Sequence, residues 1–343
     1  MRKLLNTLYV FTEDAYLALE GKNVVVWRSD EQLGRVPLHT LEGILIFSYK
    51  GASPALMGAC ANSGIQLSFF TPHGRYLAGV HGRQRGNVLL RREQHSIASD
   101  CDRSLAISRN FIIGKIYNGR WVIERCLRDH SLRVDCDRLR ICSAHLKSSI
   151  NSAADASSID ALRGIEGDAA QEYFSAFDQL ILRDKEFFKF AGRSRKPALD
   201  AVNAMLSLFY TVLASDCAAA LEGVGLDPYV GFMHSDRPGR PSLALDLMEE
   251  LRHVFVDRFV VSAINNRLVD TDSFIQRESG EVRLTDDARK RLFEAWQMKK
   301  KDSIVHPFLR EKMVWGLVPH VQALLLARHI RRDLDGYPPL LWK

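Results

Sequence analysis

Residues 231–251 read GFMHSDRPGRPSLALDLMEEL, and this stretch decides where a loop gives way to a helix in the second half of the chain. Pro238 and Pro241 exclude a continuous helix from His234 onward, because proline removes a backbone donor and clashes with the preceding turn. Ser242 is a suitable N-cap for the helix that follows. We therefore expect His234 on a loop and a helix that begins near Ser242.

The expected helix has one acidic side. At about 100° per residue, leucines occupy one side, and an arc on the other side carries Asp246, Glu249, Glu250 and His253. The pattern leaves two interpretations open. Either the acidic side is exposed to water, as in an ordinary amphipathic helix, or Asp246 and Glu249 converge with His234 on a divalent ion.

A further carboxylate is found in the stretch LRGIEGDAAQEYF, residues 162–174. Glu166 lies between Gly164 and Gly167 in an otherwise good helix pattern, where each glycine costs about 0.5 to 1 kcal/mol relative to alanine. This cost suggests that another backbone or a ligand approaches the helix closely. The alternative is a tight helix crossing with Glu166 facing solvent.

The pattern of apolar residues changes near residue 96. Before it, short runs rich in Val, Ile, Phe and Tyr alternate with turn signals, as in TLYVF, NVVVW and GILIFSY, with one helix expected at SPALMGACANSG. After residue 100, a 3.6-residue period dominates, as in NFIIGKIYNGRWVIERCLRD. We expect an α+β protein with a mainly antiparallel β domain over residues 1–96 and a larger all-α catalytic domain over residues 97–343.

Composition restricts the class of protein. A chain of 343 residues with 46% hydrophobic content can bury large cores, so two domains are expected. The longest apolar run, residues 201–215, is shorter than the roughly 20 residues that a membrane span needs, and we expect a buried helix there. The six cysteines form no C-x-x-C pair, which fits thiols in a reducing cytosol. We expect a cytoplasmic protein with no membrane association.

The formal charge of +6 favours a polyanionic partner, although a basic composition alone does not identify nucleic acid. The basic residues gather in clusters, and each cluster is either a solvated surface or a phosphate-binding patch. Two of the clusters lie close to the motifs described here. We expect these two clusters to contact double-stranded DNA: Arg237 with Arg240, and Arg193 with Arg195 and Lys196.

Three motifs are typical of one family. In chain order they are LRGIEGDAAQEYF, RKPALDAVNAMLSLFYTVL and GLDPYVGFMHSDRPGRPSLALDLMEELR. Together they strongly resemble the CRISPR-associated endonuclease and integrase of spacer acquisition, the Cas1 family, over the whole chain. The stretch HSDRPGRPSLALDLMEELR and the tail YPPLLWK look closest to the subtype I-C branch. The resemblance implies a β domain that forms a homodimer, a helical catalytic domain, and a complex with a small companion subunit of the adaptation system.

The resemblance also assigns metal ligands. It implies that Glu166, His234 and Glu249 hold the metal, with Asp246 as an additional acidic position that acts directly or through water. Oxygen ligands with one imidazole and no thiolate suit Mg²⁺ or Mn²⁺. Such an ion can polarise a phosphodiester and lower the pKa of the attacking hydroxyl, which is a DNA 3′-OH in integration and water in cleavage.

Other functions remain open at this point. A non-catalytic scaffold of the adaptation complex would bind DNA and work through a partner. A metallohydrolase that acts on a small phosphoester would leave the dispersed basic clusters unexplained. The leading expectation is a metal-dependent DNA endonuclease and integrase that inserts new spacers into a CRISPR array in antiviral defence.

Overall fold

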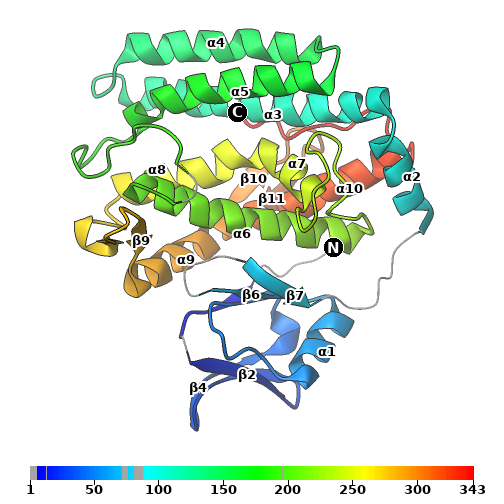
Figure 1. Ribbon diagram of the computed structural model, residues 1–343, viewed down its shortest axis with the longest axis vertical. Coiled ribbons are helices and arrows are strands. Elements are labelled where there is room, and N and C mark those ends of the chain that lie inside the picture. The colour runs from blue at the N-terminus through cyan, green and yellow to red at the C-terminus, as the bar shows by residue number, and fades with distance from the viewer. Residues whose placement is uncertain (1–5, 13, 72–75, 81–87, 195–196) are drawn as a thin grey trace. The chain divides into compact units, whose positions relative to one another are not determined.

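The structure is a computed structural model that describes residues 6–12, 14–71, 76–80, 88–194 and 197–343 (Figure 1). The described residues form two compact units. The first comprises the chain up to residue 85 with residues 286–302 and 314–317, and the second comprises the rest. Strands dominate the beginning of the chain and helices the remainder, which confirms the expected mixed α+β class.

The first unit contains two sheets. Its strands in chain order are β1 (Thr7–Val10), β2 (Ala15–Glu20), β3 (Asn23–Arg28), β4 (Glu31–Pro37), β5 (Gly43–Ile46), β6 (Gln66–Phe70) and β7 (Tyr76–Val80). Strands β2, β3 and β4 form an antiparallel sheet, as expected. The second sheet has the order β1-β5-β6-β7, in which β1 and β6 run parallel to β5 and β7 is antiparallel to β6. The expectation of a mainly antiparallel domain is therefore wrong for this second sheet.

The parallel pairing of β5 and β6 follows from the helix between them. The helix α1 (Pro54–Ser63) begins after Ser53, whose hydroxyl accepts a hydrogen bond from the Leu56 amide, and ends at Gly64 in the left-handed conformation, φ 66°. A helix of this length carries the chain back to the start of the sheet, so the next strand must run in the same direction. The predicted helix at SPALMGACANSG is confirmed.

A helix from much later in the chain belongs to the first unit. The aromatic ring of Phe293 on α9 (Asp286–Lys301) lies 4.8 Å from Tyr9, 4.9 Å from Phe11 and 5.1 Å from Phe47, measured between ring centroids. This grouping differs from the predicted division at residue 96, because the ring that packs against β1 and the end of β5 belongs to a helix that begins at residue 286.

The second unit is built mainly from helices. They are α2 (Val88–Ala98), α3 (Cys101–His130), α4 (Cys136–Ala154), α5 (Ile159–Ala176), α6 (Ala201–Val224), α7 (Ser242–Leu251), the π-helical turn Arg252–Asp257, α8 (Arg258–Asn265) and α10 (Val318–Ile330). Figure 1 shows α3, α4 and α5 side by side, and α3 also packs against α7. Asp100, Ser158 and Asp200 cap the amino ends of α3, α5 and α6 with their side chains.

The region after residue 96 is not strictly all-α. Two short hairpins interrupt it: β8 (Phe274–Gln276) with β9 (Val282–Leu284), and β10 (Ser303–Val305) with β11 (Lys312–Val314). Each strand has three residues, which is too short to produce the alternating pattern on which a strand prediction depends. Gly280, with φ 79°, lies in the turn of the first hairpin.

The helix α6 contains the long apolar run of the sequence. Among the helices that the structure describes, it alone is long and apolar enough to cross a membrane by length and composition. More than half of its apolar window is buried inside the fold, and α6 packs against α7 and α10. The prediction of a buried helix is confirmed, although the helix is longer than the run that predicted it.

Candidate functional site

Two glycines on α3 bring this helix close to α7 and the π-helical turn. A Cβ atom on Gly114 would lie 3.0 Å from the Glu250 Cβ, and one on Gly119 would lie 2.9 Å from the His253 Cδ2. Any larger side chain at either position would push the helices apart. The close packing places a third residue of α3, Lys115, among the carboxylates of α5 and α7.

Lys115 joins two of the predicted metal ligands. Its Nζ lies 2.7 Å from the Glu249 Oε2 and forms an ion pair with the Glu166 Oε1. The side chains of Lys115 and Glu249 are each 5% exposed, whereas Glu166 is 24% exposed. The structure therefore brings Glu166 and Glu249 together, as predicted, but around an ammonium group that the sequence did not identify.

Glu249 has a second cationic partner. The Arg252 Nη1 donates a hydrogen bond of 2.8 Å to the Glu249 Oε1, and the guanidinium lies 4.4 Å above the Tyr210 ring. Burial alone would raise the pKa of Glu249, but the charges of Arg252 and Lys115 outweigh burial and hold that pKa well below its usual range. Glu249 is thus a carboxylate anion across the physiological pH range.

Asp246 holds the loop that carries His234. Its carboxylate is fully buried and accepts hydrogen bonds from the backbone amides of Phe232 (2.7 Å), Met233 (3.0 Å) and His234 (3.0 Å). The fourth partner is the His234 Nδ1, at 2.6 Å. With both oxygens occupied, Asp246 orients the imidazole and leaves Nε2 as the ring nitrogen that is available to a ligand.

Gly231 and Arg163 keep this loop in place. A Cβ on Gly231 would lie 2.7 Å from the Ser242 Cβ and 3.0 Å from the Asp246 Oδ2, so only glycine allows the approach. The Arg163 guanidinium donates a hydrogen bond to the Met233 carbonyl and thereby ties α5 to the loop. His234 lies on a loop as predicted, and α7 begins at Ser242, but the cap position is Pro241 and Ser242 does not cap the helix.

The acidic side of α7 does not face water. Asp246, Glu249, Glu250 and His253 are all buried, so the interpretation as a solvated amphipathic helix is wrong. Glu250 accepts hydrogen bonds from the Tyr337 hydroxyl, from the Gln322 Nε2 at 3.0 Å and from the Leu340 amide at 2.6 Å. Burial raises the pKa of Glu250 to about 7, and these hydrogen bonds offset only part of that rise.

His253 belongs to a separate buried network. Its Nδ1 lies 2.6 Å from the Asp257 Oδ2, and Asp257 also accepts hydrogen bonds from the hydroxyls of Tyr173 and Tyr210. Burial raises the pKa of both tyrosines well above their usual value, and the Asp257 carboxylate raises it further. Because Tyr173 lies on α5 and Tyr210 on α6, the network joins these helices to the π-helical turn, and His253 therefore has a structural role.

The two glycines beside Glu166 are not sites of close helix packing. A Cβ on Gly164 or on Gly167 would meet no atom within 4 Å, and both residues are exposed. The expected approach of another backbone is therefore wrong. Both glycines lie on the exposed side of α5, about 200° and 100° around the helix from Glu166.

The donor set suits a hard divalent cation. Glu166, Glu249 and the Nε2 of His234 supply oxygen and nitrogen ligands of the kind that Mg²⁺ and Mn²⁺ accept. The Glu249 Oε2 is buried, and the Lys115 ammonium group lies 2.7 Å from it. Within the described part of the chain, however, no three such side chains lie close enough together to hold a metal as they stand.

The predicted DNA-binding residues differ in their surroundings. Among the described residues, the guanidinium groups of Arg237 and Arg240 have no hydrogen-bond or ion-pair partner, and Arg237 is exposed. Arg193 is engaged within the fold, where it donates to Asn203 and lies 5.2 Å from the Tyr210 ring. Arg195 and Lys196 lie outside the described residues.

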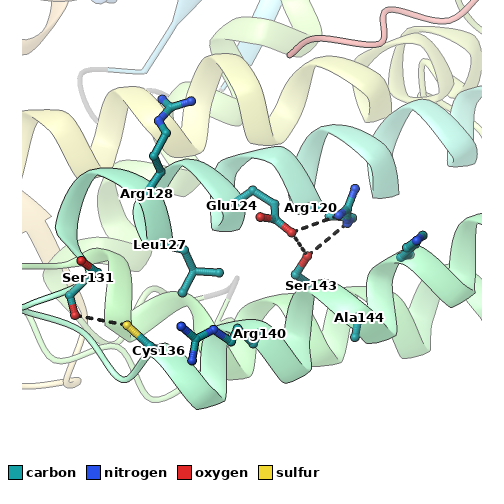
Figure 2. Close-up of a pocket in the computed structure, with 10 residues that line it drawn as sticks. Arg120, Glu124, Leu127, Arg128, Ser131, Cys136, Arg140, Ser143 and Ala144 are labelled. Carbon is teal, nitrogen blue, oxygen red and sulfur yellow. Dashed lines mark hydrogen bonds and ion pairs between the residues drawn. The ribbon is translucent and has the colours of Figure 1, made fainter.

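A basic groove between α3 and α4 was not identified from the sequence. Its volume is about 480 Å³, and four cationic side chains line it: Arg120, Arg128, Arg140 and Lys147. Figure 2 shows Arg120 and Ser143 in contact with Glu124, the acidic residue of the lining. The four cations are spread over 28 residues and form no run in the sequence, so only the pairing of the two helices assembles them.

Comparisons with known proteins identify the family of the chain. The family model described as CRISPR associated protein Cas1 matches residues 8–298. The chain is 46% identical to a CRISPR-associated endonuclease Cas1 of Chlorobaculum tepidum over 343 residues, which cover 100% of both chains.

Two solved structures share the fold. A casposase bound to integration product has a TM-score of 0.84 at 20% identity and covers 98% of this chain and 94% of that chain. A Cas6-RT-Cas1–Cas2 complex has a TM-score of 0.82 at 23% identity, covering 100% of this chain and 36% of that chain.

Proposed function

The chain belongs to the family of CRISPR-associated protein Cas1, and from this premise we propose that it is a metal-dependent DNA endonuclease and integrase that inserts new spacers into a CRISPR array. The observation that carries the proposal is the contact of Glu166 and Glu249 with the same nitrogen, the Lys115 Nζ. The stretch from His234 to Arg252 and the tail YPPLLWK support membership of the subtype I-C branch.

Mg²⁺ or Mn²⁺ is the cofactor of the proposed reaction. Glu166, Glu249 and the His234 Nε2 would hold it, and Asp246 would orient the imidazole through its contact with Nδ1. When bound, the ion supplies charge that polarises a phosphodiester and lowers the pKa of the attacking hydroxyl.

The residues of the chain prepare the site for this chemistry. Asp246 fixes the orientation of the imidazole, and Arg252 keeps Glu249 ionised through a 2.8 Å hydrogen bond. In integration, a DNA 3′-OH attacks a phosphorus atom, a new P–O bond forms and the bond to the target 3′-oxygen breaks. In cleavage, water replaces the 3′-OH, so neither reaction needs a protein nucleophile.

DNA would approach from the side of the site on which the Glu166 carboxylate is partly exposed. Arg237 and Arg240 follow His234 by three and six residues, and their guanidinium groups, which have no partner among the described residues, would bind phosphates. The Glu166 side chain is 24% exposed, which leaves its carboxylate accessible to a DNA backbone. The basic groove of α3 and α4 carries four further cations, three of which are ion-paired with neighbouring carboxylates.

Assembly is part of the proposal. We expect the strands of the first unit to form the contact of a homodimer, because β4 is an edge strand of its sheet, whereas the outer edge of β2 is partly paired with residues 51–53. The solved Cas6-RT-Cas1–Cas2 complex supports a small companion subunit. We place the protein in the cytoplasm, where its DNA substrate is found. Light scattering that gives one chain per particle at micromolar concentration would contradict the homodimer.

A non-catalytic DNA-binding scaffold is the second candidate. One observation favours it: Lys115 and Arg252 together already balance the charge of both carboxylates, so the fold does not depend on a metal. A hydrolase of small phosphoesters has no such support, because the free arginines and the basic groove extend beyond the reach of a small substrate.

An integration assay separates these functions. Purified protein, with and without the companion subunit, is given short duplex DNA and a CRISPR array in Mn²⁺ or in EDTA. We expect product only with the metal, and we expect His234→Ala to reduce it by orders of magnitude with little change in duplex affinity. The control, Arg237→Ala with Arg240→Ala, should lower duplex affinity and reduce the salt slope by about one to two. Wild-type integration by His234→Ala would leave the scaffold as the better description.

A further inference from the structure

Lys115 contacts the two carboxylates that the proposed metal needs. One nitrogen, Nζ, lies within ion-pair distance of both Glu166 and Glu249, and its side chain is 5% exposed. The lysine comes from α3, whereas the carboxylates come from α5 and α7. A metal ion bound by both carboxylates would therefore occupy the position that the Lys115 ammonium group now takes.

The charges of this cluster balance without a metal. Glu166 and Glu249 supply two negative charges, and Lys115 and Arg252 supply two positive charges. A divalent ion that entered this neutral cluster would leave it with an excess of two positive charges. In a poorly hydrated site such an excess is unfavourable unless an anion accompanies the ion.

We propose that Lys115 is an internal counter-ion that competes with the divalent metal for Glu166 and Glu249, and so makes metal binding depend on a DNA phosphate. The phosphodiester supplies the negative charge that offsets the metal when the ammonium group is displaced. Metal and DNA then bind cooperatively, and by reciprocity each strengthens the binding of the other. A metal-loaded nuclease would be rare in the absence of DNA.

The geometry indicates how the ammonium is released. Glu249 keeps its hydrogen bond from Arg252, so it remains compensated when Lys115 moves. The Glu166 side chain is 24% exposed, whereas that of Glu249 is 5% exposed. The lysine therefore has a path toward solvent and toward the phosphate, on the side of Glu166. This inference rests on the proposed metal-dependent function and specifies how that site is regulated.

Binding of Mn²⁺ to the full chain tests the inference without any activity measurement. The free Mn²⁺ signal in electron paramagnetic resonance is recorded during titration of the wild type, Lys115→Met and the charge-retaining control Lys115→Arg, each with and without a short DNA duplex. We expect Lys115→Met to bind Mn²⁺ alone about tenfold more tightly than the wild type and to gain less from DNA. Lys115→Arg should resemble the wild type.

A second neutral variant and a stability measurement cover loss of folding. Lys115→Met and Lys115→Gln should unfold at a lower temperature in EDTA and recover in Mn²⁺, because the metal replaces the lost cation. If neither variant folds even in Mn²⁺, a metal cannot replace the lysine and the inference is wrong.

The outcomes also separate the inference from the function on which it rests. No Mn²⁺ binding by the wild type, with or without DNA, would reject the metal-dependent function itself. Mn²⁺ binding by the wild type that is equal in Lys115→Met, with an equal gain from DNA, would reject the role of Lys115 and leave the function in place.

Discussion

Glu249 and Glu250 are consecutive residues on one helix, and both are buried, yet their surroundings have opposite effects. Glu249 faces α3 and the start of the π-helical turn, where two cations surround its carboxylate. Glu250 faces the segment 337–340, where a hydroxyl, a side-chain amide and a backbone amide donate to it. The pKa of Glu249 is lowered, whereas burial raises that of Glu250 to about 7.

The difference shows that burial alone does not determine the charge of a carboxyl group. Hydrogen bonds from neutral donors favour the anion, but around Glu250 they do not fully compensate for the water that burial removes. A nearby cation does replace it. One side of α7 therefore carries a permanent negative charge that suits a metal, and the other carries a carboxyl group that titrates near neutral pH.

The largest expected effect on stability comes from removing the negative charge of Glu249, which lies beside Lys115 and Arg252. Glu249→Gln leaves Lys115 and Arg252 with less compensating charge in a buried site, which should lower the free energy of unfolding by about 3 to 5 kcal/mol. Glu250→Gln is the matched control and should cost less than about 1 kcal/mol at pH 8, since it replaces a poorly stabilised anion. Urea unfolding in EDTA measures both, and equal losses would remove the distinction between the two sides.

The pH dependence of Glu250 gives the next largest effect. Its folded-state pKa of about 7 lies above the ordinary value of 4.5, so the folded state binds the proton more tightly than the unfolded state. The resulting stability is fully present below pH 4.5 and is lost as the pH rises through 7. As the pH rises from 4.5 to above 7, the free energy of unfolding of the wild type should fall by about 3 kcal/mol relative to that of Glu250→Gln, because glutamine does not titrate. Urea unfolding of both proteins across this range should show the difference, and parallel curves would contradict it.

A third test concerns the neutral donors around Asp246. Asp246→Asn places an amide opposite the backbone N–H groups of Phe232 and Met233 or the ring of His234, and should cost about 2 kcal/mol of stability. The control is Asp236→Asn, which changes an exposed acid in the same loop. Chemical unfolding of both variants provides the measurement. A similar small change in each would show that the loop does not depend on the buried carboxylate.

Several parts of this arrangement could be predicted from the sequence. Period-two and period-3.6 patterns identify β1, β2, β3 and α5 because each element carries its own apolar residues. Pro238 and Pro241 are sufficient to place His234 on a loop. The motifs likewise bring together Glu166 and Glu249, which contact the same nitrogen.

Other parts depend on contacts between distant residues. Lys115 lies 51 residues before Glu166, in a helix whose pattern shows only that it is amphipathic. The strand β4 is mostly exposed and polar, so it lacks an apolar period, and its pairing with β3 is visible only in the fold. Glu250 could not be separated from Glu249 on a helical wheel, because the donors that distinguish them come from residues 322 to 340.

The smallest expected effect is at the open surface of α5. Gly164→Ala adds a methyl group that meets no neighbour within 4 Å and should raise the stability by about 0.5 to 1 kcal/mol, because alanine favours a helix. Thermal unfolding measures this gain. Gly114→Ala is the contrasting control, since its Cβ would lie 3.0 Å from Glu250 and 3.1 Å from Pro339, and it should lower the stability. A loss at Gly164 would show that the surface is not open.

The segment 337–342 has a consequence for the order in which the protein is made. The Leu340 amide reaches Glu250 across 90 residues of chain, and Asn118 on α3 binds both Leu340 and Trp342. At about 5 to 20 residues per second, a ribosome adds Leu340 roughly 5 to 20 s after Glu250. During that interval Glu250 lacks its donors and α7 lacks part of its support against α3. A nascent chain with every proposed ligand already synthesised would thus remain without a finished site until translation reaches this segment.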